Sequence, residues 1–203
     1  MRMNNTFCKE TEKIYRLKVP FDNIYTSVFL IDAGEKRFLV DCATTAEDVD
    51  GCIVPALEEF GCVLANIDSL VISHKHHDHA GGLKRVLAIA PNIKVVTDVR
   101  ELCDGISTYS LAGHTADCIG VFDEHTGTLI TADGLQGAGV DKYRCNINDK
   151  AAYLKTIEKI KMDEKIKHIL FSHAYEPWNQ DFISGRKNIC ECLKACIEYV
   201  EEV

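Results

Sequence analysis

Short runs of apolar and β-branched residues, separated by turn residues, fill the first part of the chain. Residues 14–19, 27–31 and 37–41 have the composition of strands. Residues 20–23 predict a turn, and Ala33-Gly34-Glu35-Lys36 is a hairpin signal between the second and third runs. We therefore expect a first strand, a turn and then a β-hairpin.

After this hairpin the apolar residues take up helical spacing. The helical positions before Gly61 are Val49, Ile53, Ala56, Leu57 and Phe60. Pro55 lies among them and lacks the N–H that an α-helical hydrogen bond requires. We therefore expect a kink or a delayed helix start at this point.

The remaining pattern interleaves strands and helices. Strands are predicted at residues 67–73, 94–97, 107–111, 118–122, 128–131 and 167–171. Helices are predicted at residues 83–90, 148–160 and 183–203, with a helical turn at 98–103. Such an order of elements predicts a layered α/β protein with mixed sheets. The length of 203 residues predicts one domain, residues 1–203.

A dense group of histidines follows the strand predicted at residues 67–73. The segment reads Ser73-His74-Lys75-His76-His77-Asp78-His79-Ala80-Gly81-Gly82. Three more potential metal ligands, His114, Asp133 and His173, also follow predicted strands. Because ligand sites in layered α/β proteins form outside strand ends, we expect these groups to meet in one site.

The residue types in this set favour divalent transition metals. Imidazole nitrogen and carboxylate oxygen suit ions such as Zn²⁺, Fe²⁺ and Mn²⁺. The candidates divide into ligands of one ion (His74, His76 and His114), ligands of a second ion (Asp78, His79 and His173) and a bridging carboxylate (Asp133). Two ions about 3.5–4 Å apart can share a hydroxide that attacks an ester, thioester, lactone, amide or phosphoester.

The order of these ligands resembles the metallo-β-lactamase superfamily. The resemblance covers almost the whole chain and is carried by His74-x-His76-x-Asp78-His79, Gly113-His114-Thr115, Asp133 and Ser172-His173. It implies an αβ/βα four-layer sandwich, with two mixed β-sheets inside and helices outside. It also implies a binuclear metal-dependent hydrolase with zinc as the expected metal. Asp78 would be the catalytic carboxylate, orienting the hydroxide or taking up its proton.

The sequence departs from the superfamily's usual pattern beside three ligands without removing any of them. Ala112 precedes Gly113, Ala132 precedes Asp133, and Ala174 follows His173. The glyoxalase II-like thioesterases share the ligand set but carry a further C-terminal helical region, whereas only thirty residues follow His173. We therefore expect a small hydrolase whose substrate is a small-molecule ester, thioester or lactone.

Several residues near the ligands have two interpretations. Asp41 either holds a ligand histidine, because metal-bound imidazoles donate their other N–H, or is a turn residue at a strand end. Tyr143 and Arg144 lie in the long loop that follows Asp133, where they are candidates for substrate binding. His77 is expected to point away from the metals.

Composition narrows the partners. The net charge of −8 argues against a nucleic-acid partner. Neither a membrane-spanning segment nor a signal peptide is evident, so we expect a cytoplasmic protein. The ten cysteines include no Cys-x-x-Cys pair, and we expect most of them to be reduced core residues. The sequence leaves the oligomeric state open.

Three other functions remain open. The same ligands would suit a phosphodiesterase or nuclease. They would also suit a di-iron redox protein, in which iron would turn over oxygen, nitric oxide or a sulfur species. A regulatory metal-binding module without turnover is the third.

Overall fold

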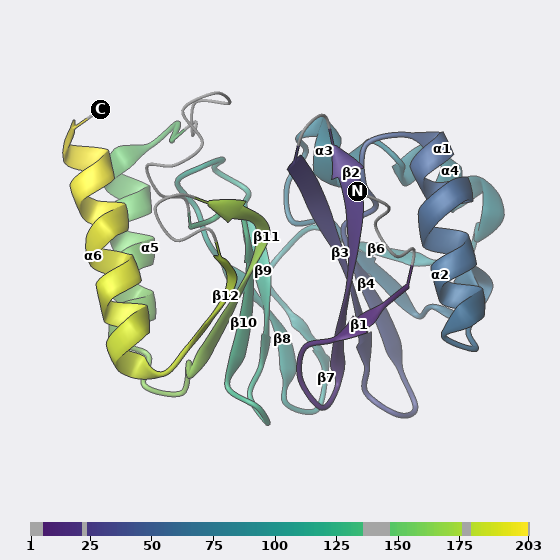
Figure 1. Cartoon of the computed structure of the whole chain (residues 1–203), viewed down its shortest axis with the longest axis horizontal. Coiled ribbons are helices and arrows are strands. Elements are labelled where there is room, and N and C mark those ends of the chain that lie inside the picture. Colours follow the sequence, from purple (N-terminus) through teal and green to yellow (C-terminus); the bar gives the residue numbers. More distant parts are fainter. Residues whose placement is uncertain (1–5, 22–23, 136–146, 176–179, 203) are drawn as a thin grey trace. The chain divides into compact units, whose positions relative to one another are not determined.

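The computed structural model describes residues 6–21, 24–135, 147–175 and 180–202. The chain divides into two compact units, residues 1–97 and 98–203 (Figure 1). Each unit is built on one six-stranded sheet. That residues 1–203 act as a single domain stays a prediction.

The sheet of the first unit combines antiparallel and parallel pairing. Its strands, in spatial order, are β1 (Cys8–Lys9), β2 (Ile14–Phe21), β3 (Ile24–Asp32), β4 (Arg37–Val40), β5 (Ser69–Val71) and β6 (Lys94–Val96). The first four pair antiparallel in sequence, which confirms the predicted hairpin, and β4, β5 and β6 run parallel. Parallel neighbours need crossover connections, and helices supply them here.

Helices cover one face of this first sheet. They are α1 (Ala46–Asp48), a π-helical segment (Val49–Ile53), α2 (Val54–Glu59), a 3₁₀ turn (Leu64–Asn66), α3 (His77–Ala80) and α4 (Leu83–Ile89). Ile53 and Leu57 from the helices pack with Leu30 and Leu70 from the strands in one buried apolar cluster. This burial against the sheet is the main source of stability for such short helices.

The predicted disturbance at Pro55 takes the form of a π-helical turn. The segment Val49–Ile53 widens the helix immediately before the proline, and α2 then begins with Pro55 in its first turn. The N–H of Val54 closes the wide turn by donating to the carbonyl of Val49. The wide turn accommodates the proline, which has no N–H, because the helical hydrogen bond just before it reaches from Val54 back to Val49.

The sheet of the second unit is antiparallel except at one pair. Its strands, in spatial order, are β12 (Gln180–Ser184), β11 (His168–Tyr175), β10 (Thr128–Ala132), β9 (Ile119–Asp123), β8 (Ile106–Ser110) and β7 (Glu101–Cys103). β10 and β11 run parallel, with α5 in the connection between them. The strands predicted at residues 118–122 and 128–131 are confirmed, and they pair as a hairpin with Phe122 opposite Leu129.

The helical turn predicted at residues 98–103 is wrong. Residues 101–103 form strand β7, which pairs with β8 and places Cys103 opposite Ile106. The two residues between them, Asp104 and Gly105, are a two-residue hairpin loop, with Gly105 at φ +69°. An Asp-Gly pair readily provides the positive φ that such tight turns require, and this signal was missed.

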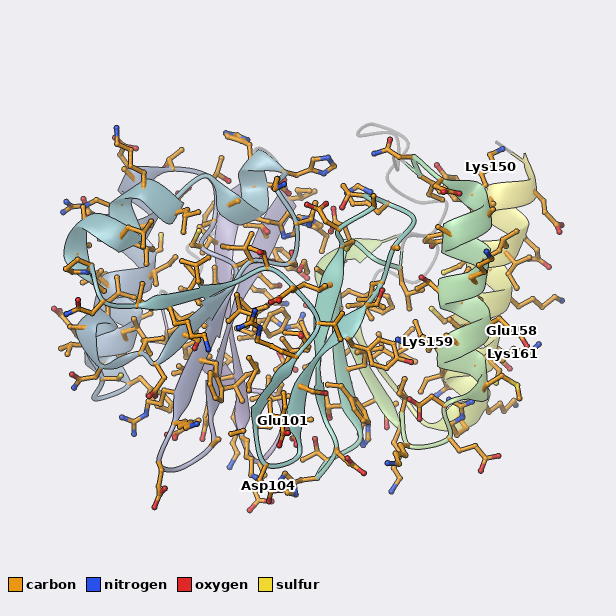
Figure 2. All side chains as sticks on the ribbon, turned by 180° about the vertical axis from the view of Figure 1, so that it is seen from behind. Glu101, Asp104, Lys150, Glu158, Lys159 and Lys161 are labelled. Carbon is orange, nitrogen blue, oxygen red and sulfur yellow. The ribbon has the colours of Figure 1, made fainter. Side chains whose placement is uncertain are left out.

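Two antiparallel helices cover one face of the second sheet. They are α5 (Lys150–Met162) and α6 (Arg186–Glu202), which pack on each other and share a buried apolar cluster with the strands. The charged side chains Lys150, Glu158 and Lys161 lie along the exposed side of α5 (Figure 2). A helix from residue 183 was expected, but Ile183 belongs to β12, where it pairs with Ile169.

The described cysteines are mostly core residues, as expected. Cys42, Cys62, Cys118, Cys192 and Cys196 are buried, and all nine described cysteines are free thiols. Hydrogen bonding to Cys196 and burial raise the pKa of the Cys192 thiol far above its usual range. Such a thiol stays protonated and behaves as a small apolar side chain. Among the described residues, no helix has the length and apolar character needed to cross a bilayer.

The first residue of α6 closes the end of α5. The Arg186 guanidinium donates to the carbonyls of Ile160, Asp163 and Ile166 at 3.5, 3.3 and 3.2 Å. It also donates to the carbonyl of Lys161. Carbonyls at a helix C-terminus lack intrahelical donors and carry partial negative charge, so a guanidinium stabilises them.

We predict that Arg186→Ala lowers the free energy of unfolding by about 1–3 kcal/mol, because hydrogen bonds from a charged donor are lost. Urea denaturation followed by circular dichroism measures the change. Lys187→Ala is the control, since Lys187 is exposed and makes only an i,i+4 ion pair at 3.9 Å. Equal destabilisation by the two substitutions would contradict the capping role of Arg186.

Candidate metal centre

Strand β5 delivers the histidine segment of the first unit. Ser73 and His74 follow β5 in buried, extended chain, and His76 is the residue before α3. The segment turns helical at His77, so Asp78 and His79 lie on a helical turn. His77 is exposed.

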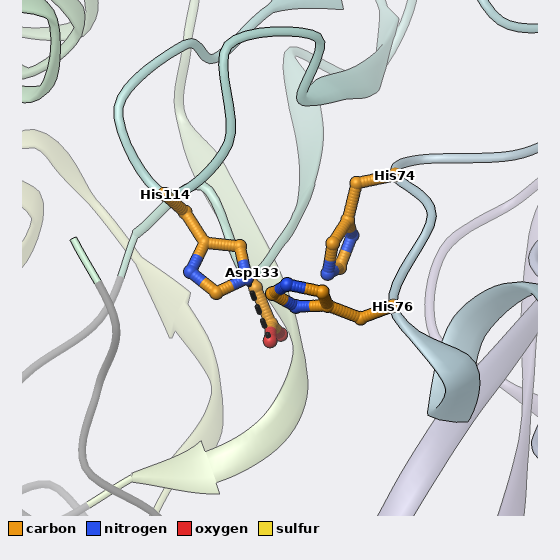
Figure 3. Close-up of side chains that lie close together, drawn as sticks. All are labelled: His74, His76, His114 and Asp133. Carbon is orange, nitrogen blue, oxygen red and sulfur yellow. Dashed lines mark ion pairs between the residues drawn. The ribbon is translucent and has the colours of Figure 1, made fainter. Parts of the chain in front are cut away.

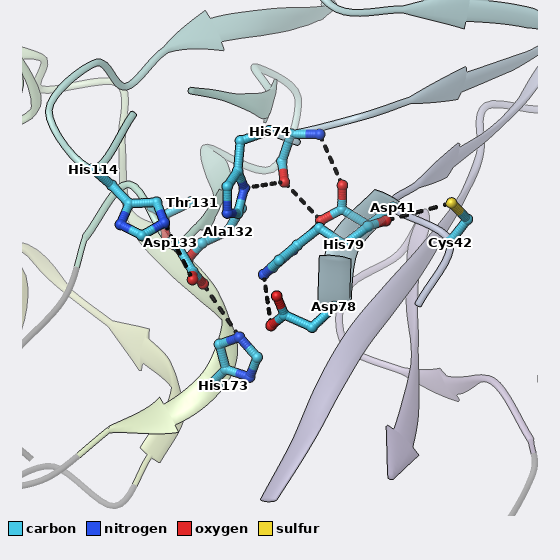
Figure 4. Close-up of polar contacts among 11 residues, drawn as sticks. Asp41, Cys42, His74, Asp78, His79, His114, Thr131, Ala132, Asp133 and His173 are labelled. Atoms are coloured by element: carbon cyan, nitrogen blue, oxygen red, sulfur yellow. Dashed lines mark hydrogen bonds and ion pairs between the residues drawn. The ribbon is translucent and has the colours of Figure 1, made fainter. Parts of the chain in front are cut away.

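Asp41, which follows β4, organises this segment. Its Oδ1 accepts a hydrogen bond from the Ser73 backbone N–H at 2.8 Å, and its Oδ2 accepts one from the Ser73 hydroxyl at 2.8 Å. Oδ2 also accepts from Nδ1 of His79 at 2.7 Å (Figure 4). The carboxylate is fully buried. Of the two interpretations of Asp41, the structure supports the one in which it holds a histidine.

Counting hydrogens along this network fixes the tautomers of two histidines. The Ser73 hydroxyl has one hydrogen, and it goes to Asp41. The contact of 3.0 Å between Ser73 Oγ and His74 Nδ1 therefore requires a hydrogen on that nitrogen. His79 likewise carries its hydrogen on Nδ1, facing Asp41. Both rings thus keep the lone pair on Nε2, an arrangement in which this nitrogen can bind a metal ion.

A close approach of backbones holds the helical turn in place. Gly82 donates to the carbonyl of Ala43, and Cys42 donates to the carbonyl of His79. Asp41 and Ala43 have positive φ angles of 65° and 58°, so the loop after β4 bends sharply toward α3. A Cβ on Gly81 would lie 1.9 Å from the Thr44 carbonyl oxygen, so only glycine fits there.

The second unit contributes three donors from three different segments. His114 follows β8 in a tight loop, Asp133 directly follows β10, and His173 lies in β11. β11 was expected to end at residue 171 but continues to Tyr175, with an irregular register against β12 after Leu170. All three donor side chains are buried.

The two carboxylate oxygens of Asp133 lie close to different histidines. Oδ2 lies 3.7 Å from His114 Nε2 (Figure 3). Oδ1 lies 3.3 Å from His173 Nε2 (Figure 4). One oxygen of this carboxylate thus lies near each of the two histidines.

The described donors fit divalent metal ions. Two ligands about 2.0–2.2 Å from one tetrahedral ion are themselves about 3.3–3.5 Å apart. The pair Asp78 Oδ2 and His79 Nε2, at 3.3 Å, has this separation, as does the pair formed by Asp133 and His173. A direct charge-assisted hydrogen bond would be about 2.7–2.9 Å. The spacing and the nitrogen and oxygen donors therefore suit Zn²⁺, Fe²⁺ or Mn²⁺.

The chain is similar in sequence to several known proteins. Residues 20–92 match the family model described as "Anti-Pycsar protein Apyc1". A "Beta-lactamase-like protein 2 homolog" of Drosophila melanogaster is 29% identical over 178 residues, covering 73% of this chain and 58% of that protein. A "Hydroxyacylglutathione hydrolase" of Hahella chejuensis is 29% identical, covering 62% of this chain and 59% of that protein. The chain thus spans less than two thirds of these relatives.

Solved structures show the fold. A metallo-β-lactamase from Erythrobacter litoralis aligns with a TM-score of 0.72 at 19% identity, covering 100% of this chain and 99% of that one. The metallo-β-lactamase FIM-1 from Pseudomonas aeruginosa aligns with a TM-score of 0.74 at 15% identity, covering 97% and 95%. The chain therefore has the metallo-β-lactamase fold, with two mixed sheets flanked by helices. The fold that the resemblance to the metallo-β-lactamase superfamily implies is confirmed.

The candidate substrate residues Tyr143 and Arg144 lie outside the described residues. No role was predicted for Ser73, although a hydroxyl directly before the first histidine is a visible signal. The need for glycine at position 81 has a weaker signal in the Gly81-Gly82 pair, because the group that it contacts lies far away in the sequence.

We predict that Gly81→Ala destabilises the protein by at least ~1–3 kcal/mol, because the added methyl group overlaps the Thr44 carbonyl. Thermal denaturation monitored by circular dichroism measures the loss. Gly51→Ala is the control, since a Cβ at Gly51 meets nothing within 4 Å. If Gly81→Ala has the same melting temperature as the wild type, the position of α3 does not depend on the close approach of Gly81 to the Thr44 carbonyl.

Proposed function

We propose that this protein is a hydrolase that uses two divalent metal ions, with zinc first and iron or manganese as alternatives. The proposal unites the donors of both units. The assignment is His74, His76 and His114 for one ion, Asp78, His79 and His173 for the other, and Asp133 for both. The observation that carries it is the ligand-like spacing of the donor pairs within each unit.

When bound, two such ions would lower the pKa of a shared water and polarise the bond that it attacks. The protein supplies the orientation. Ser73 and Asp41 accept hydrogen bonds from Nδ1 of His74 and Nδ1 of His79, respectively. These bonds fix the orientation of both rings and leave Nε2 as the atom that would bind an ion. Asp78 is partly exposed, and its carboxylate can both bind an ion and accept the proton of the attacking water.

The substrate we propose is a small-molecule ester, thioester or lactone. A relative named for hydrolysis of hydroxyacylglutathione supports an acyl compound. Because this chain spans 59% of that relative, the proposal extends to the class of bond and not to the glutathione part. The net charge of −8 disfavours long polyanions, which makes a nuclease the weaker reading of the same site.

Removal of metal should abolish hydrolysis, because the nucleophile depends on the ions. The test compares chelator-treated protein with protein reconstituted with Zn²⁺, Mn²⁺ or Fe²⁺, using esters, thioesters, lactones and bis-p-nitrophenyl phosphate. Restored cleavage of an acyl substrate supports the proposal. Cleavage of the phosphodiester alone would replace it with a phosphodiesterase, and no cleavage by any metal form would contradict both.

We expect Asp78→Asn to lower kcat/KM by ~10²–10⁴-fold, because an amide can neither accept the proton nor bind an ion as a carboxylate does. The fold should persist, as judged by circular dichroism. Asp50→Asn is the matched control, since Asp50 is an exposed carboxylate of the same unit that pairs with Arg85 at 2.8 Å. Near-normal turnover by Asp78→Asn at full metal content would refute the role of Asp78.

A further inference from the structure

Helix α5 contacts the loop that carries His114 at three points. The backbone N–H of Asp149, the N-cap residue, donates to the carbonyl of Gly113 at 3.0 Å. Tyr153 packs so closely that a Cβ on Gly113 would lie 2.5 Å from its Cα. The Thr156 hydroxyl donates to the carbonyl of Ala112 at 2.7 Å. Because these positions are spaced by four and three residues, one stripe of the helix follows the loop.

The loop has internal bonds that a shift would break. Gly113 has a φ of +143° and donates to the carbonyl of Thr115 at 3.0 Å. Leu111 donates to the carbonyl of Cys118 at 2.9 Å, which closes the loop at its base. His114 therefore has little freedom as long as the carbonyls of Ala112 and Gly113 stay bound to α5.

Thr156 is the side chain in this contact that can be changed with the least disturbance. A threonine inside a helix often bonds the carbonyl one turn earlier, but this hydroxyl reaches a loop 44 residues away in the sequence. Thr156 is 5% exposed, and its bond to Ala112 is partly shielded from solvent. A partly buried carbonyl that loses its donor moves or takes up water, and either response shifts the loop.

We propose that Thr156 is a positioning residue for His114, acting through the carbonyl of Ala112. It touches no candidate ligand directly, and its effect is on metal affinity. The inference rests on the proposed metal site. Partners that orient metal ligands typically account for about 10–100-fold in affinity, which sets the size of the expected effect.

The test is Co²⁺ binding by the full chain after metal removal, read from the visible absorption of the bound ion. Thr156→Val keeps the shape of the side chain and removes its hydroxyl. It should weaken Co²⁺ binding at the site that includes His114 about 10-fold or more. Thr156→Ser should restore the affinity, because its hydroxyl can donate to the same carbonyl. This readout does not depend on a known substrate.

Thr108→Val is the matched control. Thr108 lies in the same unit, is 3% exposed and donates its hydroxyl to the carbonyl of Asp98 at 2.8 Å; Asp98 is not a candidate ligand. It should bind Co²⁺ like the wild type. Equal weakening in both valine variants, or unchanged affinity in Thr156→Val, would overturn the role of Thr156. Failure of the wild type to bind Co²⁺ would instead overturn the metal site itself.

Discussion

The buried carboxylate of Asp41 is the constraint on which the histidine segment depends. It accepts three hydrogen bonds, from the Ser73 backbone, the Ser73 hydroxyl and His79. A buried carboxylate is costly unless it is fully hydrogen-bonded, so the network forms as a unit. The network orients two candidate ligands that we assign to different ions, because Asp41 bonds His79 directly and His74 through Ser73. Asp41 thus orients donors for both of the metal ions that we propose.

The two units hold their donors by different physical means. In the first unit, side-chain hydrogen bonds orient the imidazoles, and glycines let α3 approach the loop after β4. In the second unit, Thr156 of α5 and the N-cap residue Asp149 donate hydrogen bonds to the main-chain carbonyls that precede His114. Asp133 follows Ala132, which has a φ of +46°, so the chain turns sharply as β10 ends. Backbone strain of this kind persists where the surroundings enforce it, and it is concentrated at functional sites.

Local sequence patterns were sufficient to predict most strands and helices. They failed where pairing with a distant strand decided the structure. The hairpin between β9 and β10 was predicted because its apolar strands flank an evident turn. β7 was missed because only three residues form the strand, and its stability comes from pairing with β8. The start of α6 was placed too early because Ile183 fits a helical stripe as well as an edge strand. Pairing with β11 decides in favour of the strand, since it satisfies backbone groups that a helix start would leave open.

The sequence by itself determined the kind of donors, their order and their positions after strands, and these sufficed to predict the fold and a metal-dependent chemistry. It could do so because imidazole and carboxylate groups at fixed spacing carry their chemistry with them. Only the tertiary structure decided which groups hold the donors in place. Asp41 and Ser73 are separated by 32 residues, and Thr156 and Ala112 by 44. No local pattern encodes such pairings, because each forms only after burial of the apolar clusters has brought distant segments together.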